Sequence, residues 1–117
     1  MHELSTSRQQ AYRADPEIVR GMVERIVARF QPMRVILFGS RARGTANAGS
    51  DVDLLVVLND TPDPRRAAVD LLDDLADFPA AKDILVTTPE EIARRGTAPG
   101  SVLRAALEEG TVLYERS

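Results

Sequence analysis

Apolar residues follow two spacings along the chain, and these spacings predict alternating helices and strands. Between residues 18 and 30 they recur every three or four positions, which is typical of a helix with one buried face. Pro16 favours the start of this helix, and Pro32 favours its end near Gln31. Residues 34–38 contain instead the uninterrupted apolar run Val-Ile-Leu-Phe, which predicts a buried strand.

The rest of the chain continues the alternation. Gly39 allows the chain to leave the first strand tightly, and Pro79 and Gly110 favour the ends of two later helices. The predicted elements are a short helix over 40–44, a loop over 45–50, a strand over 51–58, a helix over 64–78, a strand over 83–86, helices from 89 to 95 and from 101 to 110, and an edge strand over 111–114.

This order of elements predicts an α+β domain, in which a small mixed β-sheet packs in layers with helices. Residues 1–14 are polar and without pattern, so we expect an N-terminal lead followed by a single domain over residues 15–117. Hydrophobic residues make up 44% of the chain and charged residues 28%, as in ordinary globular domains.

Composition excludes several classes of function. The chain has no cysteine, which excludes disulfides and thiolate metal sites. Its net charge of −3 argues against direct binding to nucleic acid. No apolar stretch approaches the roughly 18 residues that a membrane span requires. We therefore expect a cytoplasmic protein without membrane contact.

Three carboxylates form the predicted catalytic and metal-binding set. Asp51 and Asp53 stand at alternate positions of one strand and so project from the same side of the sheet. Two carboxylates that converge in this way repel each other unless a cation lies between them, and Mg²⁺ prefers such oxygen ligands together with phosphate oxygens. Asp83 opens the next strand and reaches the pair if the two strands are neighbours.

A polar turn before this pair is suited to phosphate binding. Gly39 leaves room for a triphosphate, and Ser40 offers a hydroxyl and a backbone N–H at a helix start. Arg41 and Arg43 can add charge-assisted contacts. The turn fits neither the dinucleotide fingerprint nor the Walker A pattern, so these two kinds of nucleotide site are set aside.

Other acids have simpler structural interpretations. The acids at 60, 63, 90 and 91 lie in turns or at helix starts, where capping explains them. The acids at 70, 73, 74 and 77 recur along the polar side of the predicted helix 64–78, and we interpret them as a solvated face.

The combined motif resembles a known family. Gly39-Ser40, ten residues and then Asp51-Val-Asp53 is similar to the signature of the DNA polymerase β-like nucleotidyltransferase superfamily. The segments Leu-Phe-Gly-Ser-Arg-Ala-Arg-Gly over 37–44 and Ser-Asp-Val-Asp-Leu-Leu-Val over 50–56 resemble the minimal nucleotidyltransferases, which include MntA-type antitoxins. The resemblance covers most of residues 16–115.

The resemblance implies a polymerase β-like fold and a role for each matched residue. Asp51, Asp53 and Asp83 would hold two Mg²⁺ ions, and Asp83 would help to activate the acceptor hydroxyl. The predicted ATP-binding set comprises Gly39, Ser40, Arg41, Arg43 and Ser50. Members of this size commonly neutralise a HEPN-domain RNase toxin by transferring AMP from ATP to a tyrosine hydroxyl of that toxin, which makes such a toxin the expected partner.

A second hypothesis comes from a different class of function. The protein could be a non-catalytic antitoxin or regulatory subunit that blocks its partner by occlusion. The two hypotheses differ in the role of the acids, because only the enzyme needs Asp51 and Asp53 to neutralise the partner. The complete acidic set favours the enzyme.

Overall fold

A computed structural model of the protein describes residues 16–39 and 52–116. The predicted polar lead, the short helix over 40–44 and the loop over 45–50 lie outside these residues. The described elements are α2 (Pro16–Phe30), β1 (Arg34–Phe38), β2 (Val52–Val57), α3 (Pro64–Asp74), β3 (Lys82–Thr87), α4 (Pro89–Arg95), α5 (Val102–Glu109) and β4 (Thr111–Glu115). This order confirms the predicted α+β alternation.

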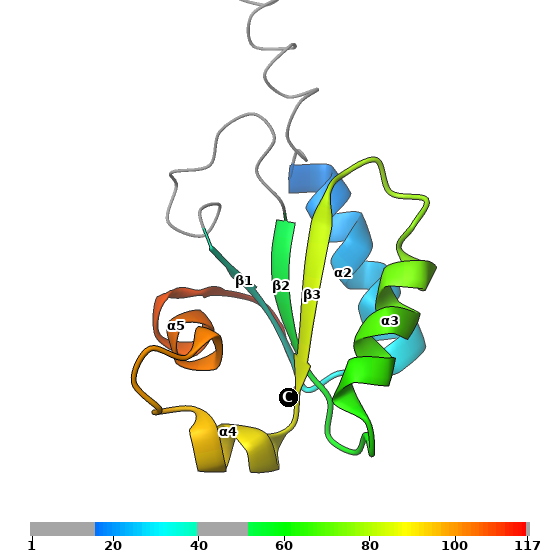
Figure 1. Ribbon diagram of the computed structural model, residues 1–117. Helices are drawn as coiled ribbons and strands as arrows, with labels where there is room; N and C mark the ends of the chain where they lie inside the picture. Colours follow the sequence, from blue (N-terminus) through cyan, green and yellow to red (C-terminus); the bar gives the residue numbers. More distant parts are fainter. Residues whose placement is uncertain (1–15, 40–51, 117) are drawn as a thin grey trace, which may run out of the picture.

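The four strands form one mixed sheet in the order β3-β2-β1-β4 (Figure 1). β1 runs antiparallel to both β2 and β4, whereas β2 and β3 are parallel. The predicted edge strand is confirmed as β4. The parallel pair matters most for function, because it places the beginnings of β2 and β3 at the same end of the sheet.

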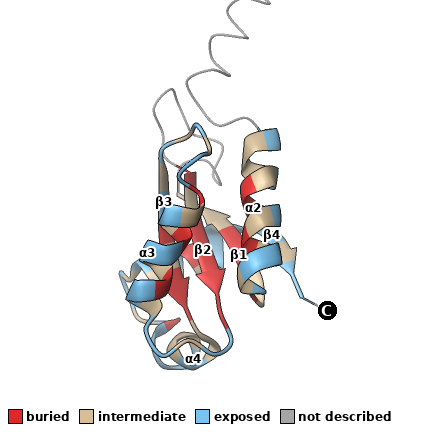
Figure 2. Ribbon diagram, turned by 90° about the vertical axis from the view of Figure 1, so that its right-hand side faces the viewer, coloured by how far each residue is buried: buried red, intermediate tan, exposed pale blue. Residues whose placement is uncertain are grey.

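Helices cover the two faces of the sheet unequally. Against one face, α2 and α3 pack around a core of thirteen buried residues, among them Leu54, Leu71 and Ile26. Against the other face, α4 and α5 enclose a cluster with only four buried members, which are Ile36, Leu55, Val57 and Ala106. Figure 2 shows the buried residues on the strands and on the inner sides of α2 and α3. We call the first face the closed face and the second the open face.

Helix α3 ends at Asp74, so the predicted extension to residue 78 is wrong. The guanidinium of Arg25 in α2 donates a 2.9 Å hydrogen bond to the Asp74 carbonyl and an ion-paired hydrogen bond to the Asp77 carboxylate. It also lies 4.7 Å from the centre of the Phe78 ring. These tertiary contacts satisfy the end of the helix and turn the chain toward α2, which helical periodicity alone does not reveal.

The interpretation of the acidic series as a solvated face is confirmed for Asp70, Asp73 and Asp77, which are exposed, and needs correction only at Asp74. Asp74 pairs with Arg29 at 2.8 Å, and its side chain is 19% exposed. Asp77 pairs with Arg25. Two members of the series therefore join α3 and the following turn to α2.

Local caps explain where the later helices begin and end. The Thr88 hydroxyl accepts a hydrogen bond from the Glu91 N–H, and the Ser101 hydroxyl accepts one from the Arg104 N–H. Gly110 closes α5, but its φ of −77° is not left-handed. Glycine is needed there for space, because a Cβ would lie 2.4 Å from the Ala106 carbonyl oxygen.

None of the helices within residues 16–39 and 52–116 is both long enough and apolar enough to cross a membrane.

Candidate active site

Two acidic residues meet at the shared beginning of β2 and β3. Asp53 and Asp83 are partners in the parallel register, so their Cα atoms lie about one strand spacing apart, roughly 4.8 Å. Asp53 is half-buried and Asp83 is exposed. The prediction that the strand carrying Asp83 lies beside the strand of the acid pair is confirmed.

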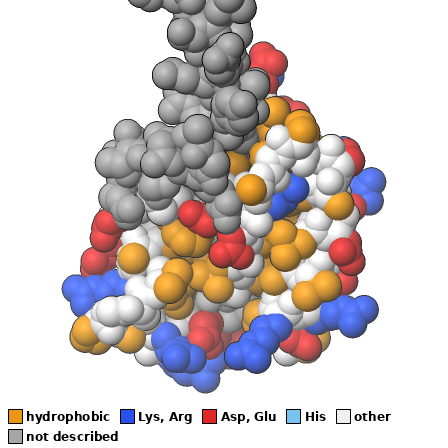
Figure 3. Space-filling view, turned by 45° about the horizontal axis from the view of Figure 1, so that its top comes forward, with side chains coloured by type: hydrophobic (Ala, Val, Ile, Leu, Met, Phe, Trp, Pro, Cys, Tyr) orange, Lys and Arg blue, Asp and Glu red, His pale blue; other side chains and the backbone are white. Residues whose placement is uncertain are grey.

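Both carboxylates belong to the open face. Side chains alternate along a strand, and Leu55 and Leu85, two positions further on in β2 and β3, pack in the open-face cluster. Figure 3 brings this end of the molecule forward and shows acidic side chains among hydrophobic ones. Among the described residues, the acids thus stand at the end of the sheet on the face that carries the smaller buried cluster.

Gly39 lies directly against Asp53, one member of this pair. Phe38 at the end of β1 is the antiparallel partner of Asp53, and Gly39 follows it with a φ of +78°, which confirms the predicted tight exit from the strand. A Cβ on Gly39 would lie 2.4 Å from Oδ2 of Asp53 and 3.3 Å from its Cγ. The sequence analysis assigned Gly39 to phosphate binding and missed this contact, which becomes visible only once the β1–β2 register is known.

Five of the predicted site residues lie outside the described part of the chain. They are Ser40, Arg41, Arg43, Ser50 and Asp51. Their assignments to ATP and to metal remain predictions.

The described carboxylates suit a divalent cation in their chemistry. Asp53 and Asp83 offer hard oxygen donors from adjacent strands, which is the donor type that Mg²⁺ uses together with water and phosphate. Within residues 16–39 and 52–116 no group of three His, Cys, Asp or Glu side chains could by itself hold a metal ion.

The turn that leads into Asp83 contacts α2 through Asp77 and Phe78. Lys82 donates a 3.3 Å hydrogen bond to the Phe78 carbonyl, and Gly21 leaves just enough room for the Phe78 ring, since a Cβ there would lie 3.0 Å from it. The hydrogen bond from Arg25, together with its positive charge, lowers the pKa of the Asp77 carboxyl below its ordinary value. These contacts fix the turn before β3 and so support the position of Asp83.

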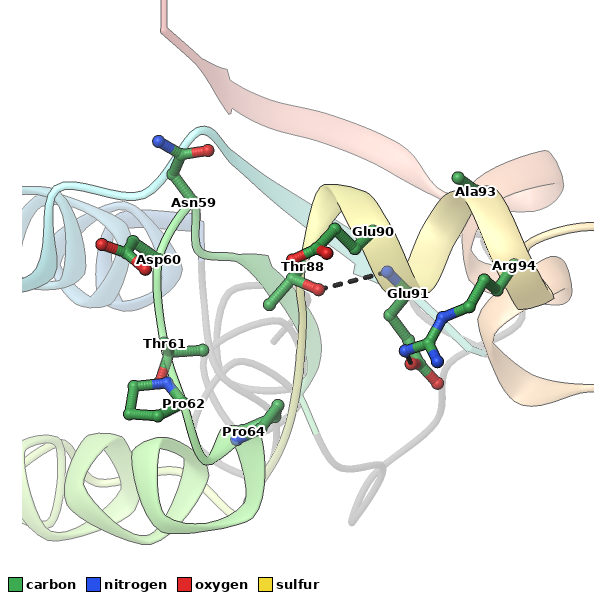
Figure 4. A pocket seen from close by; sticks show the side chains of 10 residues that line it. All are labelled: Asn59, Asp60, Thr61, Pro62, Pro64, Thr88, Glu90, Glu91, Ala93 and Arg94. Atoms are coloured by element: carbon green, nitrogen blue, oxygen red, sulfur yellow. Dashed lines mark hydrogen bonds and ion pairs between the residues drawn. The ribbon is translucent and has the colours of Figure 1, made fainter.

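A pocket of about 610 Å³ lies at the opposite end of the parallel strands (Figure 4). Its lining comes from the loop after β2 and from α4, and includes Asp60, Thr88, Glu90, Glu91 and Arg94. Much of this polarity has a structural use, because Thr88 caps α4 and Glu91 pairs with Arg94 at 2.7 Å. Of the acids interpreted as caps, Asp63 accepts the capping hydrogen bond of α3 from the Arg66 N–H, whereas the Glu91 carboxylate forms ion pairs within α4. The pocket is lined by neither Asp53 nor Asp83.

The sequence matches the model of the family described as Nucleotidyltransferase domain over residues 19–113. The chain belongs to this nucleotidyltransferase family. The match spans α2 to β4 and includes Gly39, Asp53 and Asp83. The resemblance drawn from the sequence is therefore confirmed for the family and its fold. A comparison with curated proteins gives no match.

Solved structures agree with the family assignment. A candidate nucleotidyltransferase from Sulfolobus solfataricus superposes with a TM-score of 0.60 at 20% identity, over 86% of this chain and 79% of the other. A mutant of the MntA–HpeT toxin–antitoxin pair gives 0.59 at 22%, over 84% and 72%. A toxin–antitoxin structure with AMP-PNP gives 0.50 at 21%, over 83% and 73%. At these identities the likeness establishes the nucleotidyltransferase fold.

Proposed function

We propose that the protein transfers AMP from ATP to a hydroxyl group of a partner protein and acts as the antitoxin of a toxin–antitoxin pair. The observation that carries the proposal is the meeting of Asp53 and Asp83 on the open face of a nucleotidyltransferase domain. Carboxylates on adjacent strands are an arrangement suited to metal-assisted phosphoryl chemistry. The same end of the sheet receives the glycine turn proposed to hold the triphosphate.

The proposed reaction forms one bond at phosphorus and breaks another. The acceptor oxygen attacks the α-phosphorus of ATP, the bond to the bridging oxygen breaks and pyrophosphate leaves. Two Mg²⁺ ions, if bound there as we propose, would supply charge stabilisation at the α-phosphate and the leaving group. Asp51, Asp53 and Asp83 hold the metal, and Asp83, exposed at the start of β3, accepts the hydroxyl proton directly or through water.

The proposed nucleotide contacts come from the turn after β1. Gly39, Ser40 and Ser50 lie against the triphosphate through backbone or hydroxyl groups, and Arg41 and Arg43 contribute charge. The AMP-PNP complex of a similar toxin–antitoxin structure supports ATP as the donor, because AMP-PNP is an ATP analogue.

The proposed partner is a HEPN-domain toxin, and the proposed acceptor is a tyrosine hydroxyl. The similarity in fold to a chain of the MntA–HpeT toxin–antitoxin pair supports a toxin as partner. The exposure of Asp83 at the start of β3 supports a macromolecular acceptor, because a large substrate can reach the carboxylate there.

The test is a transfer assay with α-phosphate-labelled ATP. Purified protein, Mg²⁺ and labelled ATP are added to a lysate of the host, with an Asp51→Asn/Asp53→Asn double variant in parallel. We expect one labelled protein band that disappears with the double variant, and the mass of that band identifies the partner.

The assay also separates the enzyme from the occluding antitoxin. Purified partner is assayed for toxicity with wild-type protein and with the double variant. Loss of neutralisation while the complex still forms supports the enzyme. Neutralisation by the double variant in a stoichiometric complex, without label transfer by the wild type, overturns the proposal in favour of occlusion.

A further inference from the structure

Gly39 packs more tightly against Asp53 than a turn at the end of a strand requires. A side chain at this position would meet three successive atoms of Asp53, with distances of 2.4 Å to Oδ2, 3.3 Å to Cγ and 3.5 Å to Cβ. The space normally taken by a Cβ is thus occupied by the carboxylate of the acid proposed to bind metal. Any residue other than glycine would compete with Asp53 for that space.

The surrounding sheet leaves the backbone little freedom to relieve such a clash. Phe38, one residue before Gly39, is the register partner of Asp53, so the two backbones are tied together at this point. β2 lies between β1 and β3, and Val52 and Leu54 on either side of Asp53 are fully buried. The side chain of Asp53 would have to turn away, because core packing resists backbone shifts.

Comparison with a second glycine, Gly100, distinguishes the effect of this contact from the effect of a left-handed backbone. Gly100 has a φ of +74°, almost the same as the +78° of Gly39, but a Cβ on Gly100 would meet nothing within 4 Å. Alanine at either position carries the penalty of a left-handed backbone. Only alanine at position 39 also displaces a carboxylate.

We propose that Gly39 is a positioning residue, which holds the Asp53 carboxylate beside Asp83 by leaving it the space of a Cβ. This inference rests on the proposed function, in which Asp53 binds the metal. It gives Gly39 a role in the metal site that is separate from any contact with the triphosphate. The role acts through Asp53 and is therefore present before nucleotide binds.

The test measures Mn²⁺ binding to the purified full-length protein without nucleotide, by titration calorimetry or by the loss of the free Mn²⁺ spin-resonance signal. Omitting ATP removes any effect of Gly39 on phosphate. We expect Gly39→Ala to weaken Mn²⁺ binding about tenfold or more, the range seen when groups that orient metal ligands are changed. Gly100→Ala is the matched control, and we expect its affinity to stay within about twofold of the wild type.

A double-mutant cycle tests the contact itself by urea denaturation. We expect Gly39→Ala to lower the denaturation midpoint more than Gly100→Ala does. In an Asp53→Ala background, where Cγ and both carboxylate oxygens are gone, the shift caused by Gly39→Ala should fall to that of Gly100→Ala. An unchanged shift in that background would show that the two side chains do not compete, and would overturn the inference.

The Mn²⁺ titration distinguishes failure of the inference from failure of the proposed function. Full affinity in Gly39→Ala, combined with lost affinity in Asp53→Asn, would overturn the positioning role and leave the metal site intact. Absence of Mn²⁺ binding in the wild type would remove the metal from the proposed function, and the inference would fall with it.

Discussion

The closed and open faces of the sheet divide stability and chemistry between them. Among residues 16–39 and 52–116, the closed face carries thirteen buried residues, most of them from α2, α3 and three strands, whereas the open face carries four. Asp53 and Asp83 lie on the open face, although the residues on either side of Asp53 in the chain, Val52 and Leu54, belong to the closed core. The period of two in a strand thus places the Asp53 carboxylate on the open face while both of its chain neighbours are packed in the closed core.

This division explains how a small domain can place carboxylates side by side. Like charges on adjacent strands destabilise the sheet, and burying them would cost still more. The domain tolerates the pair because Asp83 is exposed and because the closed face supplies the compensating burial. We therefore expect changes on the open face near the acids to affect function, and changes on the closed face to affect folding.

The largest expected effect is functional and follows from Asp83→Asn. We expect nucleotidyl transfer to fall about 10³-fold, as when a positioned catalytic group is removed. The free energy of unfolding should change by less than about 0.5 kcal/mol, because the side chain is exposed. Glu90→Gln, an exposed acid in the pocket at the opposite end of the sheet, is the control and should leave transfer unchanged. Equal losses in both variants would contradict the division.

The next effect is structural and compares one leucine from each face. Leu71 in α3 is fully buried in the closed core, and Leu71→Ala should lower the free energy of unfolding by about 3 kcal/mol. Leu103 in α5 is only half-buried on the open face, and Leu103→Ala should cost about 1 kcal/mol. Urea denaturation measures both. A larger cost at Leu103 would show that the open face carries the stability.

Gly110 tests the comparison of the two faces further, because it lies at a tightly packed point of the open face. A Cβ there would lie 2.4 Å from the Ala106 carbonyl oxygen and 2.5 Å from Cγ2 of Ile36. We expect Gly110→Ala to cost about 2 kcal/mol through overpacking, measured by thermal or urea unfolding. An unchanged stability would mean that α5 shifts freely over the sheet.

The smallest effect concerns the ion pair that ties the turn before β3 to α2. Arg25 lowers the pKa of Asp77, so the pair stabilises the fold when Asp77 is ionised. This stabilisation should be present above the ordinary carboxyl pKa of about 4 and should be lost as the pH falls through the lowered value. We expect the stability difference between wild type and Asp77→Asn to shrink on acidification to about pH 2. A difference that grows on acidification would contradict this sign.

The sequence was sufficient for features that depend on local pattern. The apolar runs over 35–38 and 54–58 predicted β1 and β2, and the predicted start of a helix at residue 64 matches the start of α3. The position of Asp83 beside Asp53 followed from a single assumption, that consecutive strands of an alternating α/β segment are neighbours.

Features that depend on contacts between distant residues could not be predicted in this way. The early end of α3 depends on Arg25, which is 49 residues from Asp74 in the chain. The space that Asp53 takes from Gly39 depends on the register of β1 and β2. Periodicity describes which face a residue prefers, but it does not give the partner that it meets there.

The most direct test of the account is the location of a divalent cation. Crystals of the wild-type protein grown with Mn²⁺ and AMP-PNP would show the metal by its anomalous scattering. The account predicts a peak bound by carboxylate oxygens of Asp53 and Asp83, on the open face at the beginning of β2 and β3. A peak bound elsewhere, such as beside Asp60 and Glu90 at the other end of the sheet, or no peak at the acid pair in crystals that contain the nucleotide, would contradict it.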